Sequence, residues 1–285
     1  MDLCDIRTVR RIMSDFGLSF RHELGQNFLT DASVIDAIAQ AGTEEPDGTV
    51  LEIGAGIGTL TRALAARSRR VIALEIDRSL IPVLDYTLGD LPNVTVRNED
   101  VMRSDLGEVL SEAFCEGPVS VCANLPYYIT SPILMKLLES GLPFSTVTVL
   151  VQKEFAERLT AAPGGKEYGS VTVAAAYYGE SECLADVPAD RFVPAPKVDS
   201  TVVRIRLYGE KKPVCPASEE AFFRTVRAAF LQRRKTLVNA LANGIPGLTK
   251  EQAADAVRAI GFPPDVRGER LSPADFARLS DLLPG

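Results

Sequence analysis

The 285-residue sequence contains a single histidine and no apolar run long enough to cross a membrane. One imidazole, that of His22, is too few for most zinc sites, catalytic triads and histidine general bases. The five cysteines are scattered, odd in number and form no C-x-x-C pair, which argues against disulfides and cysteine metal sites. We therefore expect no bound metal, and any catalysis must use other groups.

The overall composition is that of a globular protein. Hydrophobic residues make up 46% and charged residues 24%, and the length suffices for one large domain and one small one. The first residues show neither a secretory signal nor an acid-poor transit peptide, so we expect a cytoplasmic protein that does not bind membranes. The net charge of −7 argues against a surface that coats nucleic acid, although phosphate binding depends on a local basic patch.

Segments rich in β-branched residues alternate with segments whose apolar residues recur at helical spacing. The expected strands cover residues 49–53, 70–76, 94–98, 119–124 and 146–152. This alternation predicts an open, mostly parallel α/β sheet.

The pattern changes after residue 168. Residues 170–184 and 200–208 predict two longer strands that form an antiparallel hairpin at the sheet edge. Residues 217–244 predict one long helix, and two more helices follow the capping residues Thr249 and Ser272. We expect an α/β domain over 1–208 and a small helical domain over 209–285.

A glycine-rich turn, "LEIGAGIGTLT" at 51–61, follows the first of the parallel strands. Glycines such as Gly54 and Gly56 let the backbone approach a ligand at the carboxyl edge of a sheet. Taken alone, this turn is equally well explained as a tight β-α connection. Glu52 before it is a feature of E-x-G-x-G-x-G methyltransferase loops, whereas Thr59 stands where the dinucleotide pattern G-x-G-x-x-G needs glycine.

Two further strand ends carry carboxylates. Glu75 closes the second strand, where it can accept hydrogen bonds from both ribose hydroxyls, and Asp100 follows the third, where it can accept one from an adenine amine. Asp100 by itself would be an ordinary loop acid. The fourth strand runs into "NLPYYIT" at 124–130, which in isolation reads as a solvated turn. Together the strand ends favour an adenosine-containing ligand.

Seven motifs in order resemble those of the ribosomal RNA adenine N6-dimethyltransferases, most closely the bacterial small-subunit type. They are "LGQNFL", "EIGAGIGTLT", "ALEID", "NED", "NLPYYIT", "VQKEFAERL" and "FVPAPKVDSTVVRI". The resemblance implies a Rossmann-like class I methyltransferase fold with a small C-terminal all-α domain. It implies transfer of methyl groups from S-adenosyl-L-methionine to two adjacent adenosines in a hairpin near the 3′ end of 16S rRNA. The implied partner is the immature small ribosomal subunit, and the implied state is a monomer.

The resemblance also assigns the cofactor site. An N-terminal extension over residues 1–30 is expected to cover the cofactor, the glycine loop to lie beside its amino-acid part, and the two carboxylates to contact ribose and adenine. The expected contacts are Gln26, Asn27, Leu29, Gly54, Gly56, Glu75, Ile76, Asp100, Val101 and Asn124.

The same resemblance places the transfer step at 124–127. Adenine N6 is a poor nucleophile, so its amine must be oriented; the Asn124 side-chain oxygen and the Leu125 carbonyl are expected to accept its hydrogens. Pro126 fixes the backbone there. Tyr127 and Phe192 are expected to stack on the target base, although Phe192 without the family would be read as a core residue.

Basic residues near the C-terminus suggest an RNA surface, although a solvated helix face opposite a buried aromatic stripe explains them equally well. The expected RNA contacts are Lys197, Arg224, Arg227, Arg233, Arg234 and Lys235. His22 and Glu23 stand in a segment that is often more basic in the family, so RNA contacts there stay open.

Three alternatives remain at this point. The first is a 23S rRNA methyltransferase of the macrolide-resistance type, the second a non-catalytic ribosome-assembly factor on the same fold, and the third a dehydrogenase, against which Thr59 counts. DNA adenine and protein glutamine methyltransferases usually carry Asn/Asp-Pro-Pro-Tyr, so Leu125 argues against both.

Overall fold

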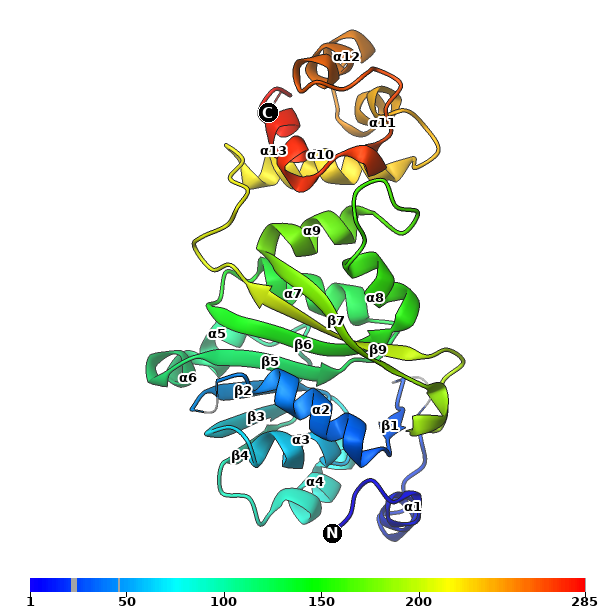
Figure 1. Ribbon diagram of the computed structural model, residues 1–285. Helices are drawn as coiled ribbons and strands as arrows, with labels where there is room; N and C mark the ends of the chain where they lie inside the picture. The colour runs from blue at the N-terminus through cyan, green and yellow to red at the C-terminus, as the bar shows by residue number, and fades with distance from the viewer. Residues whose placement is uncertain (22–24, 46, 285) are drawn as a thin grey trace. The chain divides into compact units, whose positions relative to one another are not determined.

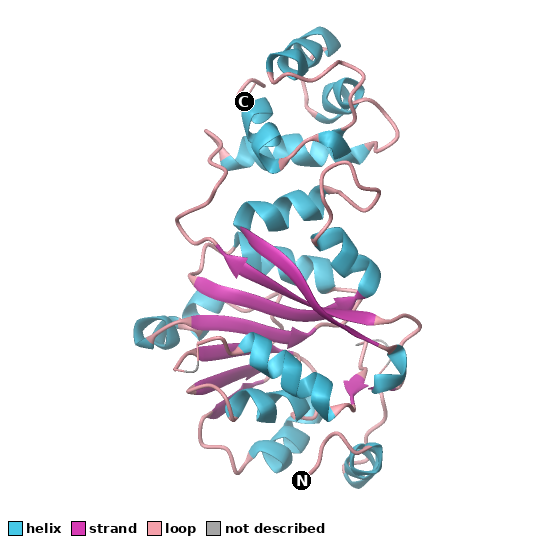
Figure 2. Ribbon diagram, in the orientation of Figure 1, coloured by secondary structure: helices cyan, strands magenta, loops and turns pink. Residues whose placement is uncertain are grey.

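The computed structural model describes residues 1–21, 25–45 and 47–284. Its centre is a seven-stranded sheet in the order β4-β3-β2-β5-β6-β9-β7 (Figures 1 and 2). The strands that pair in parallel are β2 (Thr49–Ile53), β3 (Arg70–Leu74), β4 (Val94–Arg97), β5 (Val119–Asn124) and β6 (Phe144–Gln152). The predicted parallel sheet is therefore confirmed, with strand boundaries within about two residues.

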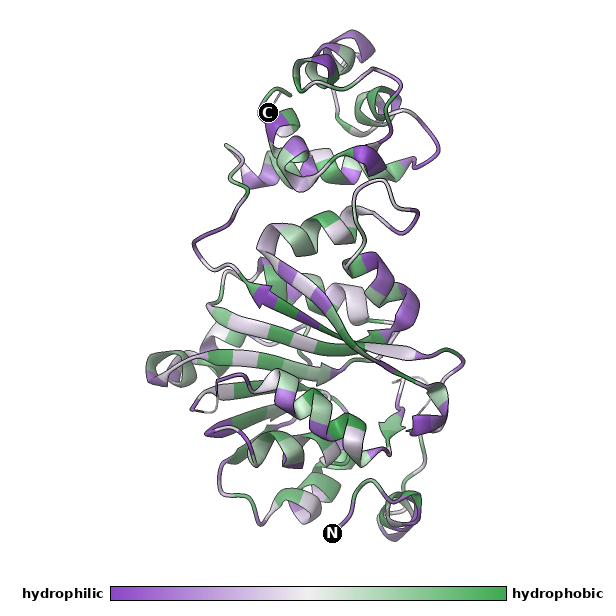
Figure 3. Ribbon diagram, in the orientation of Figure 1, coloured by the Kyte–Doolittle hydropathy of each residue, from purple (hydrophilic) through white to green (hydrophobic). Residues whose placement is uncertain are grey.

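The antiparallel edge of the sheet is also confirmed in part. β9 (Ser200–Leu207) pairs antiparallel with β6, and β7 (Gly179–Val187) lies beyond β9 at the edge. Residues 170–178, however, form a helix, α9 (Ser170–Tyr178), in place of the predicted first half of the strand. Nearly all of its side chains are buried and it has no strongly hydrophilic face (Figure 3), so the sequence carries no periodicity to distinguish helix from strand.

Helices cover both faces of the sheet. On one face, α2, α3 and α4 share a hydrophobic core with strand residues such as Val50, Val71 and Cys122. In Figure 1, α7 passes behind the sheet on the other face. The bounds here are α2 (Ala32–Gly42), α3 (Thr59–Ala65), η2 (Arg78–Leu80), α4 (Ile81–Leu88), α5 (Leu106–Val109), α6 (Ser111–Glu116), α7 (Thr130–Glu139) and α8 (Lys153–Leu159).

The N-terminal segment is tied down on two sides. The short strand β1 (Phe28–Leu29) pairs antiparallel with β8 (Phe192–Val193), which follows η3 (Ala189–Arg191). Helix α1 (Ile6–Asp15) buries apolar residues in a second cluster, which also contains Phe28, Ile57 and Leu80. These contacts hold the segment after α1 against the end of the sheet where the glycine loop lies.

The chain divides into two compact units, Met1–Ala156 with Glu182–Gly209, and Glu157–Ser181 with Glu210–Gly285. The predicted boundary at 208/209 therefore misses residues 157–181, which belong with the helical unit. The physical reason is aromatic packing: the Tyr177 and Tyr178 rings stack on Phe222 and Phe223, and both hydroxyls donate to the Glu219 carboxylate at 2.9 and 2.7 Å.

The predicted long helix is two helices, α10 (Glu219–Leu231) and α11 (Leu237–Gly244). The break falls at residues 232–236, where the Thr236 side chain caps α11 by accepting from the Asn239 N–H. The capping signals at Thr249 and Ser272 are confirmed, for α12 (Lys250–Ala259) and α13 (Pro273–Ser280), with η4 (Gly268–Arg270) between them. In the described part of the chain, no helix is long and apolar enough to span a membrane.

Close packing of α2 on β5 gives a first prediction. A Cβ added at Gly42 would lie 2.7 Å from the Cys122 sulfur and 2.9 Å from its Cβ, so Gly42→Ala should lower the free energy of unfolding by about 1 to 3 kcal/mol. Denaturant unfolding measures this. Adding Cys122→Ala should recover part of the loss, because it removes the clashing sulfur; a Gly42→Ala protein as stable as the wild type would contradict the packing.

Candidate functional site

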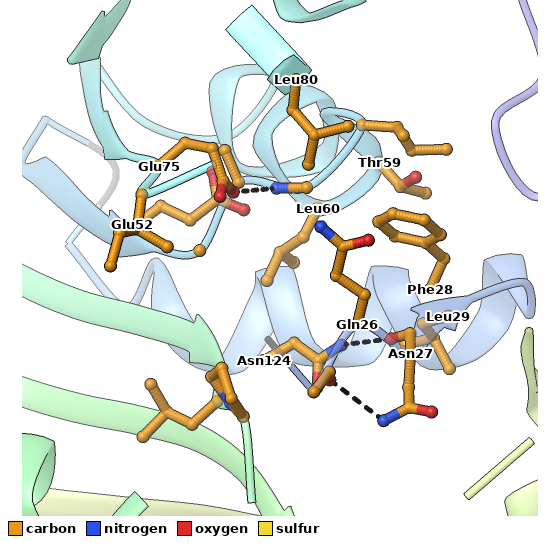
Figure 4. Close-up of a pocket in the computed structure, with 18 of the residues that line it drawn as sticks. Gln26, Asn27, Phe28, Leu29, Glu52, Thr59, Leu60, Glu75, Leu80 and Asn124 are labelled. Atoms are coloured by element: carbon orange, nitrogen blue, oxygen red, sulfur yellow. Dashed lines mark hydrogen bonds between the residues drawn. The ribbon is translucent and has the colours of Figure 1, made fainter. Parts of the chain in front are cut away.

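The carboxyl ends of β2, β3 and β5 meet at one edge of the sheet, and a pocket lies there. Its lining comes from the β1 segment, the glycine loop and the 124–127 turn (Figure 4). A second pocket beside it is lined by Asp100, Val101 and Tyr128, and shares Gly54, Ile76 and Pro126 with the first. The two form one groove, and every residue expected to contact the cofactor lines it.

The glycine loop adopts a backbone that only glycine tolerates well. Gly54, Gly56 and Gly58 have φ of +80°, +59° and +88°. At Gly56 an added Cβ would also lie 3.0 Å from the Phe28 ring. The loop therefore brings the Gly56 N–H to the pocket, where it donates to Glu75 Oε2 at 2.8 Å.

Glu75 is buried at the end of β3, with 5% of its surface exposed. Besides the Gly56 N–H it accepts the Asp77 N–H on Oε1 at 2.8 Å. Burial raises the pKa of Glu75, although these backbone hydrogen bonds oppose the shift. A carboxylate has about four lone-pair sites, so Glu75 retains acceptor capacity for hydroxyl donors in the groove.

Glu52 is a pocket residue whose protonation state the sequence did not reveal. It lines the pocket, is 1% exposed, and its Oε2 has no hydrogen-bond partner among the described residues. Burial raises the pKa of Glu52 to about 8; the nearby Thr61 side chain opposes this shift, and the charge of Glu75 adds to it. The available signal was its position inside β2, a strand buried throughout.

Asn124, the last residue of β5, has its side-chain amide fixed in one orientation. Its Nδ2 donates to the Asn27 carbonyl at 3.1 Å (Figure 4). A carbonyl can only accept, so the amide nitrogen must face Asn27 and the oxygen must point elsewhere. Within the described residues Oδ1 accepts no hydrogen bond, and it is available to a ligand amine.

The turn after Asn124 is held by backbone and side-chain contacts. Leu125 buries its side chain and donates its N–H to the Leu150 carbonyl at 3.3 Å, while the Pro126 carbonyl accepts from Ile129 N–H and Thr130 Oγ1. Tyr127 lines the pocket, and its hydroxyl lies 2.6 Å from the buried Ser200 hydroxyl. Burial raises the pKa of Tyr127, so the phenol stays neutral.

Comparison with known proteins identifies the family. The family model described as ribosomal RNA adenine dimethylase matches residues 17–283. The chain belongs to this family. It is 48% identical, over 98% of its length and 97% of theirs, to proteins named ribosomal RNA small subunit methyltransferase A from Bacillus mycoides (strain KBAB4) and Bacillus cereus (strain AH187).

Solved structures agree with this assignment. The crystal structure of the 23S rRNA methyltransferase ErmE is 30% identical, with a TM-score of 0.70 over 90% of this chain and 99% of that one. A dimethyladenosine transferase from Plasmodium falciparum, 24% identical, shares the fold with a TM-score of 0.73 over 88% and 95%. This dimethylase-family chain is therefore an enzyme, a methyltransferase with the class I Rossmann-like fold.

Phe192, expected to stack on the target base, is buried in this structure. Its side chain is 2% exposed, belongs to the same hydrophobic core as Leu29, Val187 and Val202, and lines neither pocket. The core position follows from the pairing of β8 with β1, in which Phe192 stands opposite Leu29. Tyr127 lines the first pocket directly, and so does Leu29, the residue paired with Phe192.

The residues expected to contact RNA differ in their surroundings. Arg224 donates to the Pro284 carbonyl at 2.7 Å, and Arg233 donates to the carbonyls of Lys166 and Tyr168 at 2.7 and 2.9 Å, so both hold their own unit together. The other four have exposed side chains without ion pairs in the described part of the chain: Lys197, Arg227, Arg234 and Lys235. His22 and Glu23 lie outside the described residues, and among the described ones no acid, histidine and cysteine cluster could hold a metal ion.

The raised pKa of Glu52 gives the second prediction. Between the ordinary pKa of 4.5 and about 8 the folded protein keeps a proton that the unfolded chain releases, so wild-type stability falls as pH rises through this window. Glu52→Gln removes the titrating carboxyl group and, with it, this loss of stability at rising pH. It should raise the free energy of unfolding of the ligand-free protein at about pH 9 by about 1 to 5 kcal/mol, and change it little at about pH 4.

Urea unfolding at the two pH values measures the difference. Glu139→Gln, at an exposed position, is the matched control and should leave the pH dependence as in the wild type. If the wild type and Glu52→Gln lose stability in parallel as pH rises, Glu52 is not protonated in the folded state.

Proposed function

We propose that this protein transfers methyl groups from S-adenosyl-L-methionine to adenine N6 in small-subunit (16S) rRNA. The observation that carries the proposal is the Asn124 amide, whose nitrogen is held by the Asn27 carbonyl and whose oxygen is left for a ligand. It stands in the pocket between the cofactor residues and Tyr127. The relatives named small subunit methyltransferase A support the choice of rRNA.

The chemistry of the groove suits the cofactor. Glu75 supplies acceptors for the ribose hydroxyls, Asp100 an acceptor for the adenine amine, and the half-exposed Ile76 an apolar contact for the adenine ring. The unpaired Oε2 of Glu52 suits an ammonium group, and a Cβ at Gly56 would crowd the Phe28 ring that lines the pocket. S-adenosylmethionine supplies a methyl group attached to a positively charged sulfur, and the protein need only align the acceptor amine with it.

Groups at the end of β5 align the acceptor amine. Asn124 Oδ1 and the Leu125 carbonyl accept the two N6 hydrogens, which turns the nitrogen lone pair away from the ring and towards the methyl group. Such positioning supplies up to about 7 to 11 kcal/mol of a reaction barrier, so no histidine base is needed. The leaving proton passes to water.

Base binding uses the Tyr127 ring, which the Ser200 hydroxyl holds at the groove. Extruding a base costs a few kcal/mol, least in an unpaired loop, and each stack on an aromatic ring returns about 1 to 3 kcal/mol. Stacking on a single aromatic ring therefore offsets the extrusion cost best when the target adenosine is already unpaired. Phe192, buried opposite the pocket residue Leu29, remains the proposed second wall.

The second candidate function is 23S rRNA methylation. The similarity to ErmE favours it, but at 30% identity against 48% for the small-subunit relatives. A non-catalytic assembly role would not require the Asn124 geometry.

Incubation with methyl-labelled S-adenosylmethionine and immature small subunits, large subunits or naked rRNA separates these functions. We expect N6-methylated adenosine in the small-subunit rRNA. Label in the large subunit would favour the second candidate, and no label in any substrate would sink the proposal.

The third prediction concerns Asn124. Asn124→Ala should lower the rate of methyl transfer by about a hundredfold or more, because one acceptor of the amine is lost. Binding of S-adenosylhomocysteine, measured by calorimetry, should weaken only a few-fold. A variant that methylates at the wild-type rate would rule out the acceptor role.

The fourth prediction separates RNA contacts from structural arginines. Arg234→Ala with Lys235→Ala should weaken RNA binding and flatten the plot of log affinity against log salt by about one to two units, because phosphate contacts are lost. Arg233→Ala should instead destabilise the fold, since two carbonyls lose their donor. An unchanged salt slope in the double variant would place the RNA surface elsewhere.

A further inference from the structure

Asp77 has no part in the reaction described above, yet it lies at the centre of a polar network beside the cofactor groove. It follows β3, and its side chain is buried, with 4% of the residue exposed. Its Oδ2 accepts the Gln26 Nε2–H at 2.9 Å, and the Arg21 guanidinium lies 3.4 Å from its Oδ1. The network thus links the β3 end of the sheet to the N-terminal segment.

The oxygen and the nitrogen of the Gln26 side-chain amide each make a hydrogen bond. Since a carboxylate such as Asp77 only accepts, the amide nitrogen faces it, and the oxygen is left for the Arg21 N–H, which donates to it at 2.9 Å. Figure 4 shows the Gln26 side chain projecting into the pocket from the same side as Asn27. Each of its polar atoms has one protein partner, so the Asp77 carboxylate and the Arg21 N–H fix the orientation of the side chain.

Asp77 also reaches the groove through its backbone. Its N–H donates to Glu75 Oε1, while the Gly56 N–H donates to Glu75 Oε2, each at 2.8 Å. The Asp77 Oδ1 accepts from the Ser79 N–H and hydroxyl at 3.0 and 2.6 Å, which fixes the turn that presents this N–H. The position of the Glu75 carboxylate therefore depends on the Asp77 turn.

We propose that Gln26 and Asp77 are positioning residues for the cofactor: their hydrogen bond holds Gly25–Leu29 as one wall of the pocket and braces the turn that orients Glu75. This positioning role adds to the cofactor contact expected of Gln26, whose amide keeps a second N–H and a second lone pair. The inference rests on the proposed use of the groove for S-adenosylmethionine.

A donor–acceptor swap tests the proposal. Gln26→Glu leaves two acceptors facing each other, and Asp77→Asn leaves two amide nitrogens facing each other unless one amide turns and loses its other bond. Each single variant should raise the Kd for S-adenosylhomocysteine about tenfold. The combined variant restores one donor and one acceptor and conserves net charge, and it should bind within about threefold of the wild type.

The controls use the same substitutions on exposed helix positions. Gln40→Glu on α2 and Asp85→Asn on α4 should bind like the wild type, both singly and together. Singles that bind normally, or a combination no better than the singles, would overturn the proposal.

A measurement on the protein without cofactor distinguishes the positioning role from the proposed methyltransferase function. Amide hydrogen exchange over residues 25–29 in the protein without cofactor should be about tenfold faster in each single variant and normal in the swap. If wild-type protein binds no S-adenosylhomocysteine, the proposed function fails while the exchange pattern still decides the positioning role. Unchanged exchange in the singles would reject that role whatever the cofactor does.

Discussion

The hydrogen bond from the Asn124 amide to the Asn27 carbonyl is the contact on which the site depends. It joins two segments 97 residues apart, one at the end of β5 and the other in the N-terminal segment. Because it decides which way the amide points, it leaves the side-chain oxygen free to accept a hydrogen bond from a ligand. The β1–β8 pairing and the packing of Phe28 beside Gly56 keep Asn27 within reach.

The sequence was most informative where local pattern and topology agree. Residues 49–53 and 119–124 were predicted as strands with the bounds observed, and the rule that parallel strands end at one edge was enough to gather Gly54, Glu75 and Asn124. Parallel β ladders leave little freedom at their carboxyl ends, so residues there can be placed without coordinates.

Prediction failed where the outcome depended on tertiary neighbours. The α9 helix is apolar all round, so only its packing against α10 distinguishes it from a strand. The burial of Phe192 likewise depends on a tertiary pairing, since it stands opposite Leu29. The engagement of Gln26 with Asp77 and the unpaired oxygen of Glu52 depend on side-chain directions that no spacing rule encodes.

The division of the chain into units has a consequence for how such proteins can diverge by recombination. The backbone passes between the units after residues 156, 181 and 209, so the helical unit is not a contiguous appendage. A gene fusion that exchanged only the part after 209 would separate Phe222 and Phe223 from the tyrosines they stack on. The inserted segment 157–181 and the C-terminal helices must therefore be inherited together for this packing to be kept.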